Sequence, residues 1–254
     1  MIKYKIIALA TILILITSVL YAQELKGFLY ASNQMESSNT ANEKREYITD
    51  ETAYCAILAK GFSVNPDNSV DLSADIKFID PSGKLLLEQS DYAGLKKIVQ
   101  KNTEIVNLDK SFDITFTKED PLGMYTIEIC IKDKVSNTSN RSQSTLLLFD
   151  TEESKNLIMA PVKTAKQLDD LWAEYFRSKN IWAVKRIISA LRLRKESNNI
   201  EDAAVGSAAA WSLEINAKEY PEVLKICKQS LEQTKGSTKE LLVEIIKKVE
   251  NKNF

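Results

Sequence analysis

The chain of 254 residues contains no histidine. This absence excludes Ser-His-Asp and Cys-His nucleophilic sites, histidine-ligated zinc, and general-base catalysis by an imidazole. It leaves carboxylate chemistry available, because a hydrolase can work with two carboxyl groups alone. The composition therefore favours a protein without catalytic activity, and we expect neither a cofactor nor a bound metal.

Cysteine is also scarce, with only Cys55, Cys130 and Cys227. An odd count allows at most one disulfide within the chain. In the strand-like segment 125–132 the apolar residues alternate, and Cys130 falls in the other set, so it is predicted to point outward. We therefore expect three free thiols. A bridge between Cys55 and Cys130, like the inter-sheet disulfide of immunoglobulin domains, is the alternative.

The chain has no excess of basic residues, and its formal net charge is −1. Residues 23–150 carry 14 Lys and Arg against 20 Asp and Glu, whereas residues 151–254 carry 18 against 15. Nucleic-acid-binding domains usually show a strongly basic surface, so we expect no nucleic-acid partner. The acidic and basic parts attract each other only weakly, because salt screens exposed charges beyond about 8 Å.

A single long apolar run is present, Ile6–Leu20, and two lysines precede it. It is shorter than the roughly 20 residues needed to span a bilayer. Together with the small residue Ala22, it has the layout of a secretory signal peptide. We predict a signal peptide at residues 1–22, and a periplasmic or secreted protein with no stable membrane span after cleavage. An uncleaved anchor is the alternative.

Short strand-like segments dominate residues 23–150. Val70–Ile79 and Gly123–Lys132 alternate apolar and polar residues, and Asp80–Gly83 supplies a turn. About six or seven such strands predict an antiparallel, immunoglobulin-like β-sandwich. Asp120–Tyr125 resembles the Asp-x-Gly-x-Tyr corner of immunoglobulin-like domains, with one extra residue, and that likeness implies a structural role.

The pattern becomes helical after a polar linker at residues 151–163. Helix starts are predicted at Thr164, Asn180, Asn199, Pro221 and Ser237. They define an α-helical domain of about five helices at residues 164–254, and hence an α+β protein of two domains. The Ala-rich third helix is expected at the centre of this bundle, with Trp211 in its core.

A basic run on the second predicted helix is the candidate binding site. Lys185 and Arg192 are seven residues apart and share a helix face, and Arg186 lies beside the first. Trp182 follows a turn and is the tryptophan expected at a surface groove. A solvated helix face is the simpler interpretation, and docking of an acidic surface is the functional one. We predict binding residues Trp182, Lys185, Arg186 and Arg192.

Groups of carboxylates give weaker candidates. The neighbours Glu119-Asp120 and Asp169-Asp170 diverge on a strand or helix, unlike the facing carboxylates of a hydrolase. Residues 67–75 are rich in side-chain oxygens but lack the Asp-x-Asp-x-Asp-Gly order of a calcium loop. We therefore predict no catalytic residues and no metal ligands.

A longer pattern runs through the helical half. Its four stretches begin at Leu168, Val184, Ala208 and Pro221, and read LDxLWxxYF, VxRIIxAL, AAxWSLxxNA and PxVLxIC. The pattern resembles the helical block of an uncharacterised family of exported bacterial proteins. Relatives usually have Thr-Gly-Asp where this chain has Ser178-Lys179-Asn180. The resemblance implies export and a helical fold, and it implies no activity.

These observations favour a binding or assembly protein of the bacterial cell envelope, with a protein partner. A sandwich presents edges and loops, and paired helices present grooves. The alternative is a carboxylate-based hydrolase acting on envelope polymer. Facing carboxylates from different segments, about 5–10 Å apart in a cleft, would favour the hydrolase, and a shallow aromatic groove would favour the binding protein.

Overall fold

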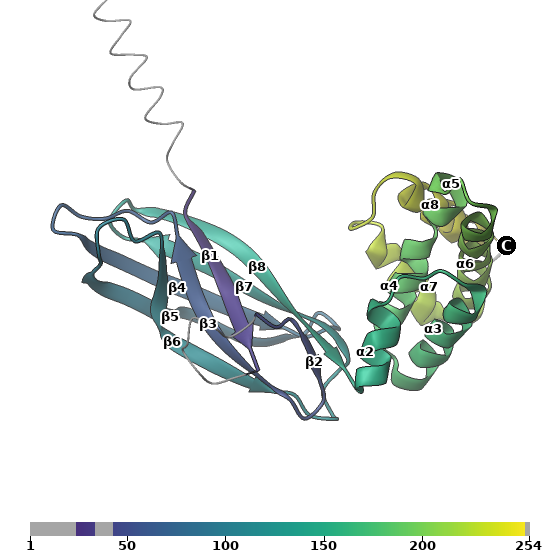
Figure 1. The fold of residues 1–254 in the computed structure, drawn as a ribbon, viewed down its shortest axis with the longest axis horizontal. Coiled ribbons are helices and arrows are strands. Elements are labelled where there is room, and N and C mark those ends of the chain that lie inside the picture. Colours follow the sequence, from purple (N-terminus) through teal and green to yellow (C-terminus); the bar gives the residue numbers. More distant parts are fainter. Residues whose placement is uncertain (1–23, 34–42, 252–254) are drawn as a thin grey trace, which may run out of the picture. The chain divides into compact units, whose positions relative to one another are not determined.

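The computed structural model describes residues 24–33 and 43–251, and the predicted signal peptide at residues 1–22 lies outside them. The strands form two sheets, and the helices follow in the second half of the chain (Figure 1). The chain divides into two compact units. The β unit consists of the described residues up to Arg45, together with Thr52–Thr115 and Tyr125–Leu146. The helical unit consists of Glu46–Glu51, Phe116–Met124 and the described residues from Leu147 onward.

The three-stranded sheet is antiparallel and has the order β1-β3-β6. Its strands are β1 (Lys26–Ser32), β3 (Thr52–Lys60) and β6 (Ile105–Thr115). The second sheet has the order β2-β8-β7-β4-β5. Its strands are β2 (Glu46–Ile48), β4 (Ser69–Ile79), β5 (Leu85–Ile98), β7 (Gly123–Asp133) and β8 (Thr138–Phe149). The short β2 pairs in parallel with the end of β8, so this sheet is mixed and not purely antiparallel.

The two sheets of the β unit face each other closely. A Cβ atom added to Gly27 of β1 would stand 3.1 Å from side-chain atoms of Ile129 and Ile131 of β7, so a larger residue would require these neighbours to shift. At one edge, the hydroxyl of Ser144 in β8 accepts the backbone N–H of Leu29 in β1 at 3.3 Å. These contacts confirm the predicted β-sandwich.

The strand order is of the immunoglobulin type. With β2 left aside, the first, second and fifth strands form one sheet, and the third, fourth, sixth and seventh form the other. Within the corner motif, the Asp120 carboxylate accepts the backbone N–H of Thr117 at 2.7 Å. The ring of Tyr125 is buried and stacks on Phe78 at 5.4 Å between centroids. Asp120 and Tyr125 therefore have structural roles, as the motif implies.

Cys130 faces outward on β7, as the alternation predicts, and Cys55 lies buried on β3. Cys227 is buried in the helical unit. All three described cysteines are free, so the alternative disulfide between Cys55 and Cys130 is not formed.

Helices are present at all five predicted positions, and four of the five predicted start signals are used. They are α3 (Ala165–Ser178), α4 (Ile181–Ala190), α6 (Ile200–Glu219), α7 (Pro221–Ser230) and α8 (Gly236–Glu250). Thr164 and Gln167 form the predicted capping box of α3, and the side chains of Asn180 and Asn199 cap α4 and α6. The predicted cap at Ser237 is wrong. Its hydroxyl donates to Glu196 instead, and α8 begins one residue earlier.

Two further helices change the predicted organisation, α2 (Glu152–Met159) and α5 (Leu193–Glu196). The segment 151–163, predicted to be a linker, therefore contains a helix. Polar residues dominate its composition, but Ser154 and Ile158 are four apart on one helical face and are both buried, and Thr151 caps the first turn.

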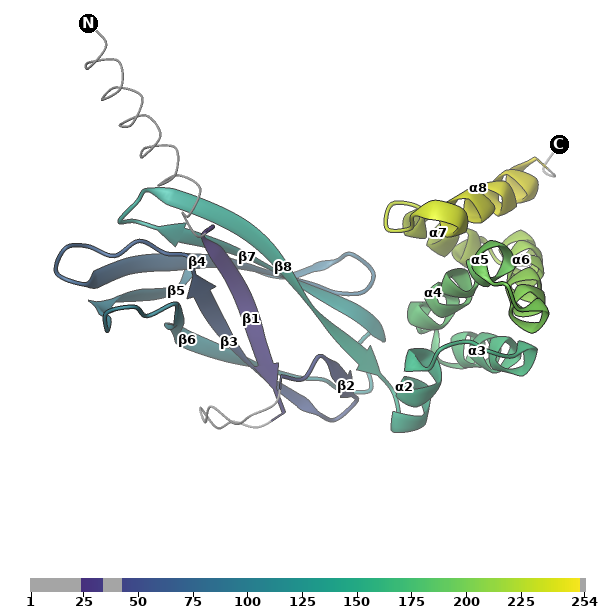
Figure 2. The same cartoon turned by 45° about the horizontal axis from the view of Figure 1, so that its top comes forward.

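The core of the helical unit lies between its helices. Buried residues of α3, α4, α6, α7 and α8 form one cluster, which also includes Phe149 at the end of β8, and Ile48 of β2 packs against it. In Figure 2 α6 lies between α3 and α8, and it also contacts α4, α5 and α7. The Ala-rich helix thus packs against most helices of this unit, but it is not enclosed at the centre, because its outer face is exposed. In the described part of the chain, no helix has the length and apolar character needed to cross a membrane.

Candidate functional site

The structure brings two of the four predicted binding residues into direct contact. The ammonium group of Lys185 lies 5.1 Å from the ring centroid of Trp182, in a cation–π arrangement. Burial lowers the pKa of Lys185. Both side chains are half-buried, so most of this pair is covered by the protein itself.

Arg186 has a structural role in addition to any role in binding. Its guanidinium donates to the backbone carbonyl of Ala160 at 2.6 Å, just beyond the end of α2, where carbonyl groups lack partners within the helix. Burial lowers the pKa of Arg186, and the nearby charge of Arg192 lowers it further. Arg192 is exposed in the turn before α5. The four predicted residues thus do not form one site: Trp182 and Lys185 contact each other, Arg186 caps the end of α2, and Arg192 is exposed at the surface.

The prediction that Trp211 lies in the core is wrong, because its side chain is 69% exposed. The buried residues of α6 share one face: Val205, Gly206, Ala209, Ala210, Leu213 and Ala217. At 3.6 residues per turn, Trp211 lies about 160° around the helix from the centre of that face. Its place after an Ala-rich run does not bury it, because helical phase decides which residues face the core.

The exposed face of α6 carries several apolar residues, together with Ser207 and Lys218. Ile200 is 86% exposed and Ile215 is 38% exposed, and with Ala204 and Trp211 they follow helical spacing along the outer side. We call this stripe the α6 crest. No charged residue occurs between Asp202 and Glu214. Exposed apolar side chains that gather on one side of a helix often mark a contact surface, and the crest is such a group.

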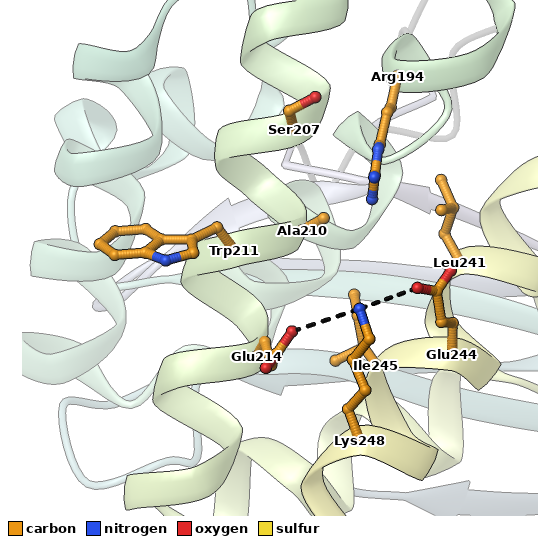
Figure 3. A pocket seen from close by; sticks show the side chains of 9 residues that line it. All are labelled: Arg194, Ser207, Ala210, Trp211, Glu214, Leu241, Glu244, Ile245 and Lys248. Carbon is orange, nitrogen blue, oxygen red and sulfur yellow. Dashed lines mark ion pairs between the residues drawn. The ribbon is translucent and has the colours of Figure 1, made fainter.

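A groove of about 210 Å³ lies between α6 and α8. Its lining residues are Arg194, Ser207, Ala210, Trp211, Glu214, Leu241, Glu244, Ile245 and Lys248. In Figure 3 the indole of Trp211 extends from α6 away from the side chains of Arg194 and Lys248. Trp211 therefore belongs to the crest and also lines the rim of the groove.

Close packing at Gly206 fixes the position of Arg194. A Cβ atom on Gly206 would lie 2.2 Å from the backbone nitrogen of Arg194, which no real side chain could tolerate. The glycine thus lets the short helix α5 rest directly on α6. The Arg194 side chain then projects into the groove (Figure 3).

The charges in the groove pair with one another, except for one. Lys248 contacts Glu244 at 2.9 Å and Glu214 at 3.8 Å, and Lys218 also pairs with Glu214. The guanidinium of Arg194 has no ion pair or hydrogen bond with any residue that the structure describes. The four charged residues that line the groove, Arg194, Lys248, Glu214 and Glu244, therefore sum to zero, and the charge of Arg194 contributes to lowering the pKa of Glu244.

The two glutamates face one groove from different helices, which is the arrangement a carboxylate hydrolase needs. However, hydrogen bonding and charge from Lys248 lower the pKa of Glu244, and the same contact raises the pKa of Lys248. A general acid requires a raised carboxyl pKa so that it holds a proton near neutral pH. The lysine between the carboxylates therefore suits ion-pair formation better than acid catalysis.

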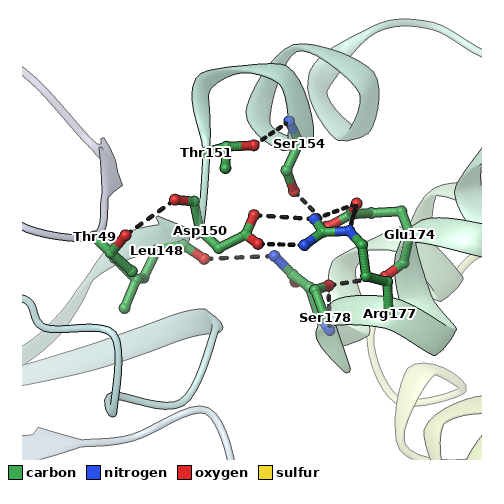
Figure 4. Close-up of polar contacts among 9 residues, drawn as sticks. Thr49, Leu148, Asp150, Thr151, Ser154, Glu174, Arg177 and Ser178 are labelled. Carbon is green, nitrogen blue, oxygen red and sulfur yellow. Dashed lines mark hydrogen bonds and ion pairs between the residues drawn. The ribbon is translucent and has the colours of Figure 1, made fainter.

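A second polar cluster joins the end of β8 to α2 and α3 (Figure 4). Arg177 donates to both carboxylate oxygens of Asp150, at 2.6 and 3.2 Å, and to Glu174 at 2.7 Å. The hydroxyl of Ser154 donates to Glu174 at 2.6 Å. The hydrogen bonds from Arg177 lower the pKa of Asp150. Every charge here has a partner, so the cluster is structural.

The oxygen-rich segment 67–75 is used in separate contacts. Asp67 accepts the backbone N–H of Ser69, Asp71 pairs with Lys96 at 3.2 Å, and Asp75 pairs with Lys132 at 2.7 Å. Among the residues that the structure describes, no three acidic or cysteine side chains are grouped so that they could hold a metal ion.

Comparisons with known proteins leave the family open. No family model matches the chain, and no curated protein matches it, so the resemblance to exported bacterial proteins stays a prediction.

Solved structures with some likeness include a family 123 glycoside hydrolase from Clostridium perfringens, at 10% identity and a TM-score of 0.30. The match covers 50% of this chain and only 28% of that enzyme. A CARDB domain from Pyrococcus furiosus matches at 15% identity and a TM-score of 0.27, over 50% of this chain and 88% of the domain. An immunoglobulin-like protein from Pseudomonas aeruginosa matches at 9% identity and a TM-score of 0.25, over 51% of this chain and 99% of that one. Similarity at this level supports no inference about function.

Proposed function

We propose that this protein is a non-catalytic binding module of the bacterial cell envelope, and that the α6 crest is its contact surface. The observation that carries the proposal is the exposure of Trp211, at 69%, on the outer side of α6, where Ile200, Ala204 and Ile215 are exposed as well. Exposing this surface to water is unfavourable, and tryptophan is among the residues that contribute most at protein interfaces. A protein partner that covers the crest would bury Ile200, Trp211 and Ile215 together.

The proposal includes export and the two-domain organisation predicted from the sequence. A signal peptide at residues 1–22 would place the protein in the periplasm or outside the cell. An immunoglobulin-like sandwich would then be followed by a helical domain, which presents the α6 crest. Trp182 and Lys185 form a second, smaller candidate contact on α4, and their half-buried state makes them secondary to the crest.

Site-specific photo-crosslinking tests the proposal directly. A benzophenone amino acid at position 211 should give a defined protein adduct in cells that carry the partner. The matched control places the same group at Ile98, which is 71% exposed in the β unit. Adducts of equal yield from both positions would contradict the proposal, because they would reflect exposure alone.

The hydrolase is the second candidate, and the facing carboxylates of Glu214 and Glu244 are the observation that favours it. If the protein is a hydrolase, it should release fragments from purified envelope polymer, and Glu214→Gln and Glu244→Gln should each abolish that release. The lowered pKa of Glu244 leads us to expect no fragments from the unmodified protein either. Polymer degradation that either substitution abolishes would replace the binding proposal.

A further inference from the structure

One edge of the five-stranded sheet is left open, along the first half of β5. β5 is the last strand of this sheet, so its outer side carries N–H and C=O groups that β4 does not pair. In the second half of β5, Asp109 of β6 accepts the backbone N–H of Gly94 at 2.7 Å. On the other side of the sandwich, serine hydroxyls of β8 bond to the backbone of β1. Residues 85–91 are all exposed, and outside β4 no residue that the structure describes hydrogen-bonds to the backbone of residues 85–90.

The residues on this open edge are apolar, with a charge at each end. Leu85, Leu86 and Leu87 are 46%, 46% and 41% exposed. Natural sheet edges are usually protected by charges, by proline or by a covering element, and a run of exposed leucines gives no such protection. Lys84 stands just before the leucines, and Glu88 stands just after them. An extended strand laid here would pair with the free backbone groups and cover the leucines at the same time.

This segment is complementary to a second copy of itself. When two copies pair antiparallel about a twofold axis, residues opposite each other are equally far from the residue on the axis. With Leu86 on the axis, Leu85 lies opposite Leu87 of the second copy. Lys84 then lies opposite Glu88, and each of these pairs occurs twice. With Leu85 or Leu87 on the axis, both charges face uncharged residues instead.

The charges set the register without adding a net attraction. Glu88 already contacts Lys77 of β4 at 2.6 Å, and the carboxylate of Asp80 accepts the backbone N–H of Lys84 at 2.9 Å. These four charges sum to zero in each copy, so two copies meet without net repulsion. Exposed ion pairs are weak, so the leucines and the backbone hydrogen bonds supply the affinity.

We propose that residues 84–88 form a homodimer contact, the β5 edge, where two copies pair antiparallel about Leu86 and their five-stranded sheets become one continuous sheet. The inference does not depend on the proposed function, because the β5 edge and the α6 crest belong to different units. So short a pairing buries less surface than a standard interface, and we therefore expect a weak dimer that forms at micromolar concentrations.

Cysteine crosslinking tests the register. In a protein that also carries Cys130→Ser, Leu86→Cys should give a disulfide-linked dimer under oxidising conditions, because the residue on the axis lies opposite itself. Leu85→Cys and Leu87→Cys should each fail alone, since diagonal neighbours are about 7–8 Å apart and beyond the reach of a disulfide. A mixture of these two variants should crosslink, because each then lies opposite the other.

Charge variants test the same contact in solution. Lys84→Glu and Glu88→Lys each place two like-charge pairs across the axis, so dimers of either variant should weaken about tenfold in sedimentation velocity. An equimolar mixture should dimerise again, because the two substitutions complement each other. Lys97→Glu makes the same charge change at an exposed position in the second half of β5, and it should leave dimerisation unchanged.

Several results would overturn the inference. A wild-type protein that stays monomeric into the millimolar range would do so, and so would stronger crosslinking of Leu85→Cys alone than of Leu86→Cys. A disulfide from Leu86→Cys to a different envelope protein would show that the edge takes an extended segment of that protein. Dimers that Trp211→Ala abolishes and the charge variants leave intact would place the contact on α6.

Discussion

At the scale of single residues, Gly206 determines the geometry of the groove more than any charged group does. It is the point where α5 and α6 touch, and the backbone of Arg194 occupies the space that a side chain would need. This contact also places Arg194 among the residues that line the groove. One small residue thus links the packing of two helices to the electrostatics of the proposed contact surface.

Gly206→Ala should destabilise the helical unit, because the new Cβ would stand 2.2 Å from a backbone nitrogen that cannot move alone. Overpacking of this kind typically costs about 1–3 kcal/mol, which outweighs the roughly 1 kcal/mol that alanine gains over glycine in a helix. Urea unfolding followed by helical circular dichroism measures the loss. Ser207→Ala, at the exposed next position, is the control and should change stability by less than about 0.5 kcal/mol.

The three cysteines should react with thiol reagents at very different rates. Burial raises the pKa of Cys55 and of Cys227 to about 12, so both are almost fully protonated at pH 8, whereas Cys130 points outward. A chromogenic disulfide reagent should label one thiol quickly in the folded protein and three after denaturation. Fast labelling that survives Cys130→Ser would show that a buried thiol is accessible.

At the scale of elements, the two tryptophans on α3 and α6 should behave in opposite ways. Trp172 is buried and stacks on Phe176 at 5.9 Å, so Trp172→Ala should cost about 3–5 kcal/mol. Trp211→Ala removes an exposed side chain and should change stability by less than about 0.5 kcal/mol. Thermal unfolding of the two variants compares them directly. Equal destabilisation would mean that Trp211 is packed against a neighbour.

The sequence predicts the elements better than it predicts the site, and α6 shows why. Its cap at Asn199 follows from local rules, as does the outward direction of Cys130 on β7. The exposure of Trp211 could also have been predicted, because it is out of phase with the buried alanines. The groove could not, because Arg194, Glu214 and Lys248 are brought together by three helices whose packing angles no local pattern encodes.

The cluster that joins β8 to α2 and α3 should make stability depend on acid pH. Arg177 holds the pKa of Asp150 below its ordinary value, near 3.9 in unfolded chains. The stabilisation is therefore complete above about pH 4 and is lost as the pH falls through the lower pKa of the folded protein. The difference in melting temperature between wild type and Asp150→Asn should be largest near pH 6 and shrink below pH 3. Asp169→Asn, which removes an exposed carboxylate outside this cluster, should show no such convergence.

At the scale of the whole molecule, export is the premise on which the proposed envelope function depends, and it can be tested without knowing the partner. The apolar run Ile6–Leu20 is too short to anchor the chain well, and Ala22 is the small residue that ends it suitably for cleavage. Intact mass of exported protein should correspond to a chain that begins at Gln23. Ala22→Phe places a bulky residue where the peptidase requires a small one, so this variant should keep residues 1–22 and stay with the membrane fraction. If the wild-type protein also keeps them, the chain is membrane-anchored, and the partner should be sought at the membrane surface.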